Sequence, residues 1–206
     1  MIDTDEIYAC SDPLVASELF LRKLKASTAE LHQALEDHPS IGAIMLPEVT
    51  KAEYCFYLQQ MQRVIATYEE HFLPLAADIY PVNEHTTLEL INNDLAALSC
   101  TAVELKPYNP APAVTKPYAL GYMYVVEGSR LGGRVILKHL ERTLGYTAEY
   151  GASYLAGHGA ETGRKWKSFL SRLSGYVISN SGIDDTINGA NDAFISIRKY
   201  FELNRK

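Results

Sequence analysis

The chain lacks most of the features that mark membrane, secreted and nucleic-acid-binding proteins. No run of about 18 apolar residues occurs in its 206 residues, so no membrane-spanning helix is expected. Residues 1–12 are acidic and have neither a basic start nor an apolar core, so no secretory signal is visible. The formal net charge is −6, whereas general nucleic-acid binding needs a basic surface. These absences predict a cytoplasmic protein that binds neither nucleic acid nor membrane.

Cysteine and the common catalytic motifs are also scarce. Cys10, Cys55 and Cys100 are widely spaced and form no C-x-x-C pair. Such an odd set fits a reducing compartment better than a disulfide framework or a thiolate metal site. The chain has no H-E-x-x-H zinc motif, no G-x-S-x-G elbow, no phosphate loop with G-K-[ST] and no Glu-x-x-His pair of the di-iron bundles. Most hydrolase, NTPase and di-iron functions are thereby excluded.

What is present is helical periodicity along the whole chain. The predicted starts of the first three helices are Asp12-Pro13, Thr50 with Glu53, and Thr86 with Glu89. Pro39 and Pro74 are expected to end the first two helices, and the prolines of residues 100–117 predict a loop. No segment alternates like a strand. We therefore expect one all-α domain over residues 1–206, a multi-helix bundle with a flexible N-terminal segment at 1–12.

The most informative stretch is residues 117–144, which reads as a helix but holds Gly128, Gly132 and Gly133 in its interior. Each interior glycine costs roughly 1 kcal/mol relative to alanine. Three glycines so close together predict that something approaches the helix backbone closely. Either a neighbouring helix packs there or a flat ligand lies across the glycines, and the pattern alone leaves both alternatives open.

Among the six histidines, His32 stands out because Glu36 follows one turn later on the same helical face. A carboxylate at that position could accept a hydrogen bond from the imidazole of a metal-ligating histidine. A surface histidine–glutamate pair is the plainer alternative. His38 is the next candidate ligand in the same region.

Taken together, these two segments resemble the haem oxygenase family. The resemblance rests on His32 in its helix and on the later sequence Glu127-Gly-Ser-Arg-Leu-Gly-Gly133. It is strongest to the bacterial branch, whose distal helix reads Tyr-Val-x-Glu-Gly-Ser-x-Leu-Gly-Gly, and it extends from about Leu21 to Phe201. It implies a haem oxygenase-like helical bundle with haem between the first helix and the kinked glycine-bearing helix.

The resemblance also implies roles for individual residues. His32 matches the proximal iron ligand and Glu36 its polar partner. Gly128, Ser129 and Gly132 match the catalytic distal stretch whose backbone faces the haem. The remaining implied haem contacts are Lys25, Thr28, Tyr124, Gly133, Lys167, Phe194 and Phe201. The plainer alternatives are solvated surface for the two lysines and ordinary core for the two phenylalanines.

Two positions depart from the family pattern. Ser129 stands where the mammalian branch has an aspartate that anchors distal water. A hydroxyl can hold water but cannot act as a carboxylate, so proton delivery is expected to follow another route. Arg130 is expected at the rim of the pocket, where it either faces solvent or meets a haem propionate.

The implied reaction opens haem to biliverdin and releases carbon monoxide and ferrous iron. Haem is then both cofactor and substrate, and O2 is the co-substrate. Because the sequence has no flavin or nicotinamide fingerprint, electrons are expected from a ferredoxin or a flavin-type reductase. A biliverdin-binding photoreceptor is one expected partner for the product.

Three other functions stay open on the sequence. The first is haem binding or trafficking without turnover, which would use the same ligating residues. The second is a thiaminase-type helical hydrolase, with Cys55 or Cys100 as nucleophile beside a carboxylate. The third is a non-catalytic interaction module in which the glycines serve packing only.

Overall fold

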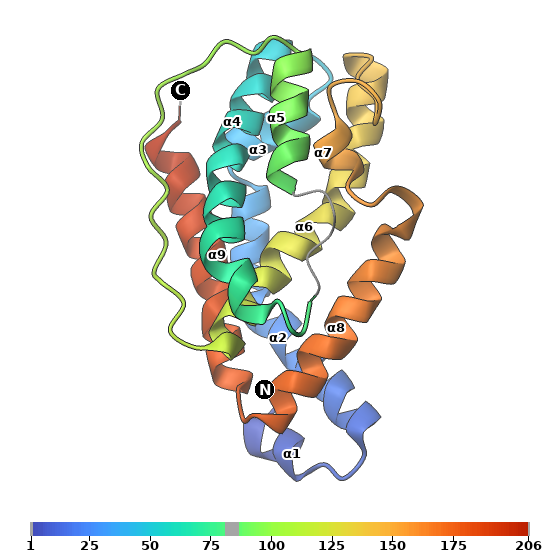
Figure 1. The fold of residues 1–206 in the computed structure, drawn as a ribbon, viewed down its shortest axis with the longest axis vertical. Coiled ribbons are helices and arrows are strands. Elements are labelled where there is room, and N and C mark those ends of the chain that lie inside the picture. Colours follow the sequence, from blue (N-terminus) through green and yellow to red (C-terminus); the bar gives the residue numbers. More distant parts are fainter. Residues whose placement is uncertain (1, 81–86, 206) are drawn as a thin grey trace.

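The computed structural model describes residues 2–80 and 87–205, and its long elements are all α-helices (Figure 1). No strand occurs within those two ranges. The helices are α1 (Thr4–Ala9), α2 (Pro13–Glu36), α3 (Pro39–Gly42), α4 (Lys51–Thr67), α5 (Thr87–Ala97), α6 (Lys116–Thr143), α7 (Ser153–Ala156), α8 (Thr162–Ser179) and α9 (Ile183–Leu203). The predicted all-α class is confirmed.

The helix starts follow the local chemistry of the sequence. The Asp12 carboxylate accepts from the backbone N–H of Leu14 at 2.8 Å, and Pro13 is the first residue of α2. Thr50 and Glu53 form both halves of a capping box at the start of α4. The expected cap at Thr86 lies outside the described residues, and α5 is described from Thr87.

The ends of the first helices differ in detail from the expectation. Pro39 begins the short α3 after α2 has ended at Glu36. Pro74 does not stop α4 directly, because the chain passes from α4 into a π-helical turn at Tyr68–Phe72 and a 3-10 turn at Leu73–Ala76.

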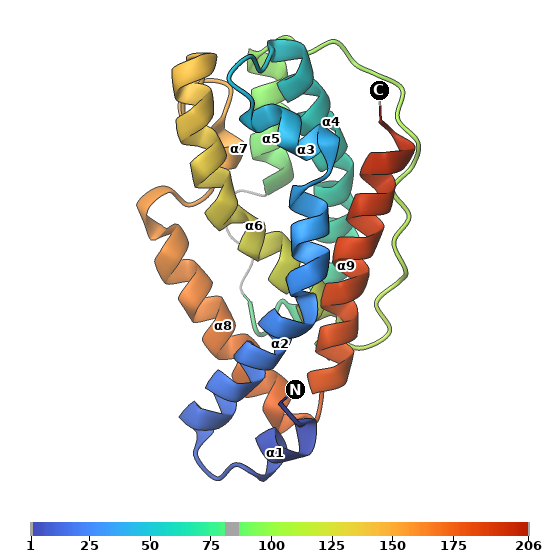
Figure 2. The ribbon, with the colours of Figure 1, turned by 180° about the vertical axis from the view of Figure 1, so that it is seen from behind.

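Helix α9 packs against both α2 and α6 and so connects these two helices. It packs extensively on α6 and also on α2, whereas α2 and α6 make few direct contacts with each other (Figures 1 and 2). The close α6–α9 crossing depends on Gly121 and Gly189. An added Cβ at Gly121 would overlap the carbonyl of Thr186, and one at Gly189 would overlap the carbonyl of Tyr118.

The N-terminal segment is a correction to the sequence analysis, which expected residues 1–12 to be flexible. Residues Thr4–Ala9 form α1, capped by Asp3, and Ile7 is completely buried. The hydroxyl of Tyr8 accepts from the backbone N–H of Ile183 at 3.0 Å. The Thr4 hydroxyl also donates to the carboxylate of Asp184 at 3.1 Å, so two hydrogen bonds attach the segment to the start of α9. The segment is too short to produce a helical pattern in the sequence.

The cysteines are a second correction, because Cys55 and Cys100 form a disulfide, with their Cα atoms 5.6 Å apart. Cys55 lies on α4 and Cys100 just after α5, and these two helices pack against each other. The packing of α4 on α5 brings the two cysteines together although they are 45 residues apart in the sequence. Their spacing alone does not predict the disulfide. Cys10 is the free thiol.

The proline-rich stretch before α6 is a loop, as predicted. It runs along the outside of the bundle and is tied down by side chains (Figure 1). The Gln59 carboxamide donates to the carbonyl of Thr101 at 3.1 Å and accepts from the N–H of Val103 at 2.8 Å. In the part of the chain that the structure describes, no helix has the length and apolar character needed to cross a membrane.

Candidate functional site

His32 lies on α2 with its side chain 56% exposed. Its Nδ1 atom is 3.6 Å from Oε2 of Glu36, which confirms that the two side chains are neighbours on one face. The ring also meets Phe194 of α9 edge to face, with centroids 5.5 Å apart. No hydrogen bond to a described residue occupies Nε2, so one ring nitrogen of an oriented imidazole is available to a metal.

Two of the other described histidines, His38 and His139, are less suited to that role. His38 is buried, its Nε2 is 3.0 Å from Glu202, and its Nδ1 accepts from the N–H of Ser40 to cap α3. Both of its ring nitrogens are therefore engaged, which removes it as the substitute ligand. His139 is bonded to the carbonyl of Leu46 at 2.9 Å. His85 lies outside the described residues.

The glycines of α6 divide between the two alternatives that the sequence left open. An added Cβ at Gly133 would lie 3.1 Å from the backbone carbonyl of Leu155, so this glycine serves packing against α7. At Gly128 it would meet the ring of Trp166 at 3.3 Å. At Gly132 it would meet nothing within 4 Å. Packing thus accounts for Gly133 and leaves Gly132, an exposed glycine in a long helix, without a packing reason.

Thr28 and Tyr124 connect α2 to α6 directly. The Thr28 hydroxyl donates to the carbonyl of Leu24 at 3.0 Å within its own helix, and the Thr28 side chain lies close enough to Tyr124 to affect its pKa. Burial raises the pKa of Tyr124, and the nearby Thr28 side chain opposes that shift. The Tyr124 ring lies 5.4 Å from that of Trp166. Two of the predicted haem contacts, one on α2 and one on α6, are therefore close to each other.

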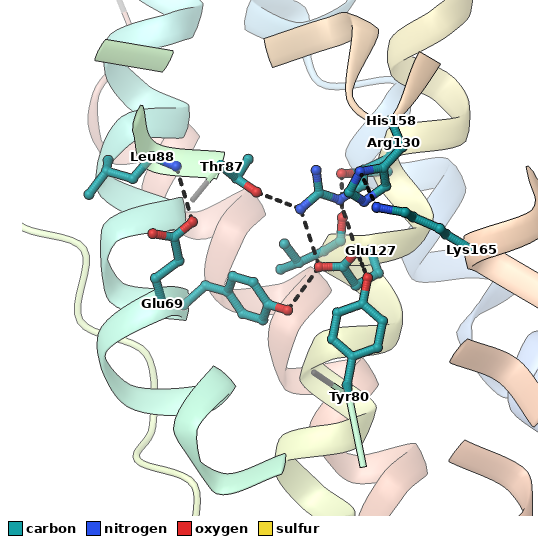
Figure 3. A network of polar contacts seen from close by, with 11 residues as sticks. Glu69, Tyr80, Thr87, Leu88, Glu127, Arg130, His158 and Lys165 are labelled. Atoms are coloured by element: carbon teal, nitrogen blue, oxygen red, sulfur yellow. Dashed lines mark hydrogen bonds and ion pairs between the residues drawn. The ribbon is translucent and has the colours of Figure 1, made fainter. Parts of the chain in front are cut away.

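A buried carboxylate on α6 organises the other side of the glycine stretch. Glu127 is 5% exposed and accepts from the hydroxyls of Tyr68 at 2.9 Å and Tyr80 at 3.1 Å, and from Nε of Arg130 at 2.9 Å (Figure 3). Arg130 donates in turn to Thr87 at the start of α5. A buried charge persists only when it is paired and hydrogen-bonded in this way.

Comparison with known proteins identifies the family to which this fold belongs. The family model described as Heme oxygenase matches residues 18–203. The chain belongs to the haem oxygenase family. A heme oxygenase from Neisseria meningitidis, solved with NO and CO bound, is 26% identical with a TM-score of 0.70, and the match covers 91% of this chain and 94% of that one.

A second haem oxygenase of known structure shares the fold. The enzyme from Leptospira interrogans is 20% identical, also with a TM-score of 0.70, over 88% of this chain and 98% of that one. No curated protein matches the chain significantly. The resemblance read from the sequence is thereby confirmed at the level of family and fold, while the roles of its individual residues stay predictions.

The other predicted haem contacts differ in their burial. Lys25 and Lys167 are exposed. Phe201 is completely buried, and its ring packs against those of Tyr57 and His38 at 6.3 and 5.9 Å. Both phenylalanines are therefore core residues, and Phe194 in addition contacts the candidate ligand His32.

The two departures from the family pattern have specific structural outcomes. Ser129 donates its hydroxyl proton to the carbonyl of Val126 at 2.7 Å, within its own helix. Arg130 does not face solvent, which corrects one of its two expected placements, and contact with a propionate stays a prediction. Its side chain is 10% exposed, because Glu127 one turn earlier draws the guanidinium inward.

The network around Glu127 was not predicted from the sequence. Burial raises the pKa of Tyr68 and Tyr80, and the nearby Glu127 carboxylate raises both further. The only available signal was a Glu–Arg pair three residues apart in an otherwise apolar stretch of helix. Such a pair is ordinarily a surface feature, and only the packing of Tyr68 and Tyr80 over it shows otherwise.

Proposed function

We propose that this family member is a haem oxygenase in activity: it cleaves haem to biliverdin, with release of carbon monoxide and ferrous iron, using O2 and external electrons. The observation that carries the proposal is the open space at Gly132, on the helix whose neighbouring glycines are used for packing. Bound haem would supply both the iron that activates oxygen and the ring that is cleaved. His32 with an available nitrogen and Phe194 beside it fit such a group.

The residues of this chain have distinct tasks in the proposal. His32 would hold the iron through Nε2, and Glu36, whose Oε2 lies 3.6 Å from Nδ1, would orient the ring as carboxylates do behind metal-bound histidines. Because Gly132 has no side chain, it leaves space beside the edge of the haem ring that would be cleaved. The absence of a side chain at Gly128 lets the Trp166 ring pack against the helix backbone. The exposed Lys25 and Lys167 are proposed to hold the two propionates by charge-assisted hydrogen bonds.

Thr28, Tyr124 and the remaining distal positions frame that site in the proposal. Thr28 of α2 and Tyr124 of α6, which lie close to each other, are proposed to line one end of the site. Ser129 and Gly133 stay proposed pocket residues, although Ser129 bonds to its own helix and Gly133 packs on α7.

External electrons are proposed to come from a ferredoxin or a flavin-type reductase. A cytoplasmic location suits such donors, and a biliverdin-binding photoreceptor is a proposed consumer of the product. The Cys55–Cys100 disulfide is the observation that opposes a reducing compartment, because disulfides persist mainly in oxidising ones.

Of the alternatives, haem binding without turnover uses the same residues and differs only in chemistry. The thiaminase-type hydrolase loses its named nucleophiles, since a disulfide sulfur cannot act as a thiolate nucleophile.

The test is a haem titration followed by a reductant in air. The wild-type chain should bind about one haem and then bleach, yielding biliverdin and carbon monoxide. His32→Ala should lose the histidine-ligated ferrous spectrum while its stability changes by no more than about 0.5 kcal/mol, because the side chain is exposed. His71→Ala, another exposed histidine beside a glutamate, is the matched control.

Two outcomes would count against the proposal. A haem complex that never bleaches under reductant and oxygen supports the carrier function. An alanine variant at His32 with the wild-type spectrum removes the ligand assignment.

A further inference from the structure

A cavity of about 10 Å³ adjoins the network on Glu127, between α6 and the start of α8. This volume corresponds to about one water molecule. The lining residues used below are Tyr80, Glu127, Arg130, His158, Lys165 and Trp166. Figure 3 shows His158 and Lys165 on the same side of the network as Arg130.

The hydrogen bond between Lys165 and His158 determines which ring nitrogen carries the proton. Lys165 Nζ lies 3.3 Å from His158 Nδ1. An ammonium group only donates, so Nδ1 must accept, and the proton of the neutral imidazole is then on Nε2. Burial, followed by the positive charges of Arg130 and Lys165, lowers the pKa of His158 to about 4, which keeps the ring neutral near pH 7.

The Nε2 atom of His158 is the group that lacks a partner. It is buried, and within residues 2–80 and 87–205 it makes no hydrogen bond. A buried donor without an acceptor is unfavourable, and ordered water commonly satisfies such groups.

The Tyr80 hydroxyl on the cavity wall is a suitable acceptor. Both carboxylate oxygens of Glu127 already accept two hydrogen bonds each, from Tyr68, Tyr80 and Arg130. The hydroxyl of Tyr80 donates to Glu127, so its oxygen can still accept. A water that accepts from His158 and donates to Tyr80 would complete a chain of hydrogen bonds. Lys165 donates to His158, His158 to the water, the water to Tyr80, and Tyr80 to Glu127.

This chain of hydrogen bonds ends at Glu127, directly before Gly128, whereas the Ser129 hydroxyl does not take part in it. The Ser129 proton is used within its own helix. Trp166, by contrast, lines the cavity on one side and covers Gly128 on the other, where an added Cβ would meet its ring at 3.3 Å.

We propose that one water molecule occupies this cavity, bound to Nε2–H of His158 and to the Tyr80 hydroxyl, and that His158 is a positioning residue for the Gly128 side of the haem site. Aligned hydrogen bonds polarise one another, so the chain of hydrogen bonds from Lys165 to Glu127 holds the carboxylate more firmly than separate bonds would. The functional half of this inference rests on the proposed function, and the water and the tautomer do not.

The first test uses the haem-free chain. A crystal structure should show a water within hydrogen-bonding distance of His158 and Tyr80, and nitrogen NMR should show His158 protonated on Nε2. The signal is assigned by its loss in His158→Gln. An empty cavity, or a proton on Nδ1, overturns the inference.

The second test compares two variants with haem bound. His158→Leu removes both hydrogen-bonding atoms, whereas His158→Gln supplies a carboxamide N–H and an acceptor oxygen. His158→Leu should shift the carbon monoxide stretching frequency of the ferrous complex and slow biliverdin formation several-fold, and His158→Gln should restore most of both. His71→Leu is the control for loss of a histidine elsewhere.

The outcomes separate the two proposals. A glutamine variant no better than the leucine variant, or a leucine variant like wild type, removes the positioning role of His158. If wild-type chain binds haem without forming biliverdin, the proposed function fails, while the carbon monoxide frequency still tests His158. If the leucine variant does not fold, the wild-type crystal and NMR results decide.

Discussion

Replacing Gly132 by alanine should make the haem-free protein more stable and the haem-loaded protein less active. The added Cβ meets nothing within 4 Å, so no repacking opposes it. Interior glycine is less favourable than alanine by about 1 kcal/mol, which for a chain of this size raises the melting temperature by about 2–4 °C. Stability and haem chemistry should therefore change in opposite directions.

Three other glycines provide matched controls. Gly175 lies inside α8, where an added Cβ also meets nothing within 4 Å, so Gly175→Ala should give a similar rise in stability with unchanged haem chemistry. Gly133→Ala would lie 3.1 Å from the Leu155 carbonyl and should gain little. Gly121→Ala would overlap the backbone of Thr186 and should cost about 3 kcal/mol or more.

The assay is thermal unfolding of all four haem-free variants, with biliverdin yield measured per haem-loaded molecule. A destabilised Gly132→Ala would refute the open space at that position. If Gly132→Ala gained stability and kept the wild-type yield and oxygen affinity, Gly132 would not face the haem.

Three further perturbations test the network and the disulfide. Reducing the Cys55–Cys100 bond, which joins residues 45 apart, should lower the free energy of unfolding by about 2–4 kcal/mol in urea titrations, and an unchanged midpoint would contradict it. Glu127→Gln should cost about 3–5 kcal/mol, because Arg130 stays buried without its counter-ion, and adding Arg130→Met should recover part of that loss. The pKa of His158 is lowered to about 4 from an ordinary 6.5, so the unfolded chain takes up the proton first and stability should fall as the pH drops between these values. Urea titrations across that range should show a weaker pH dependence for His158→Gln, and equal slopes would contradict the assignment.

The fold was predictable from the sequence where local chemistry determines the structure. Asp12-Pro13 and the Thr50–Glu53 box mark helix starts whatever surrounds them, and the family pattern supplied the helix order. The glycines showed that something comes close to α6 but not what it is. Gly121 packs on α9 and Gly132 faces open space, and the difference lies in elements distant in sequence.

The site was predictable only in its local parts. His32 and Glu36 are neighbours because one helix turn separates them. The burial of Arg130 could not be foreseen, because it depends on Tyr68 and Tyr80 covering Glu127 from other segments. The Cys55–Cys100 bond likewise follows from the packing of α4 on α5.

The position of Trp166 gives this protein a built-in optical probe. It is the only tryptophan of the chain, and its ring lies against Gly128 and 5.4 Å from that of Tyr124. Intrinsic fluorescence excited at the indole band therefore reports one location, on the distal side of the glycine stretch. Energy transfer to a haem bound there would quench the emission strongly. Haem entry and product departure can accordingly be followed in real time on the unlabelled wild-type chain.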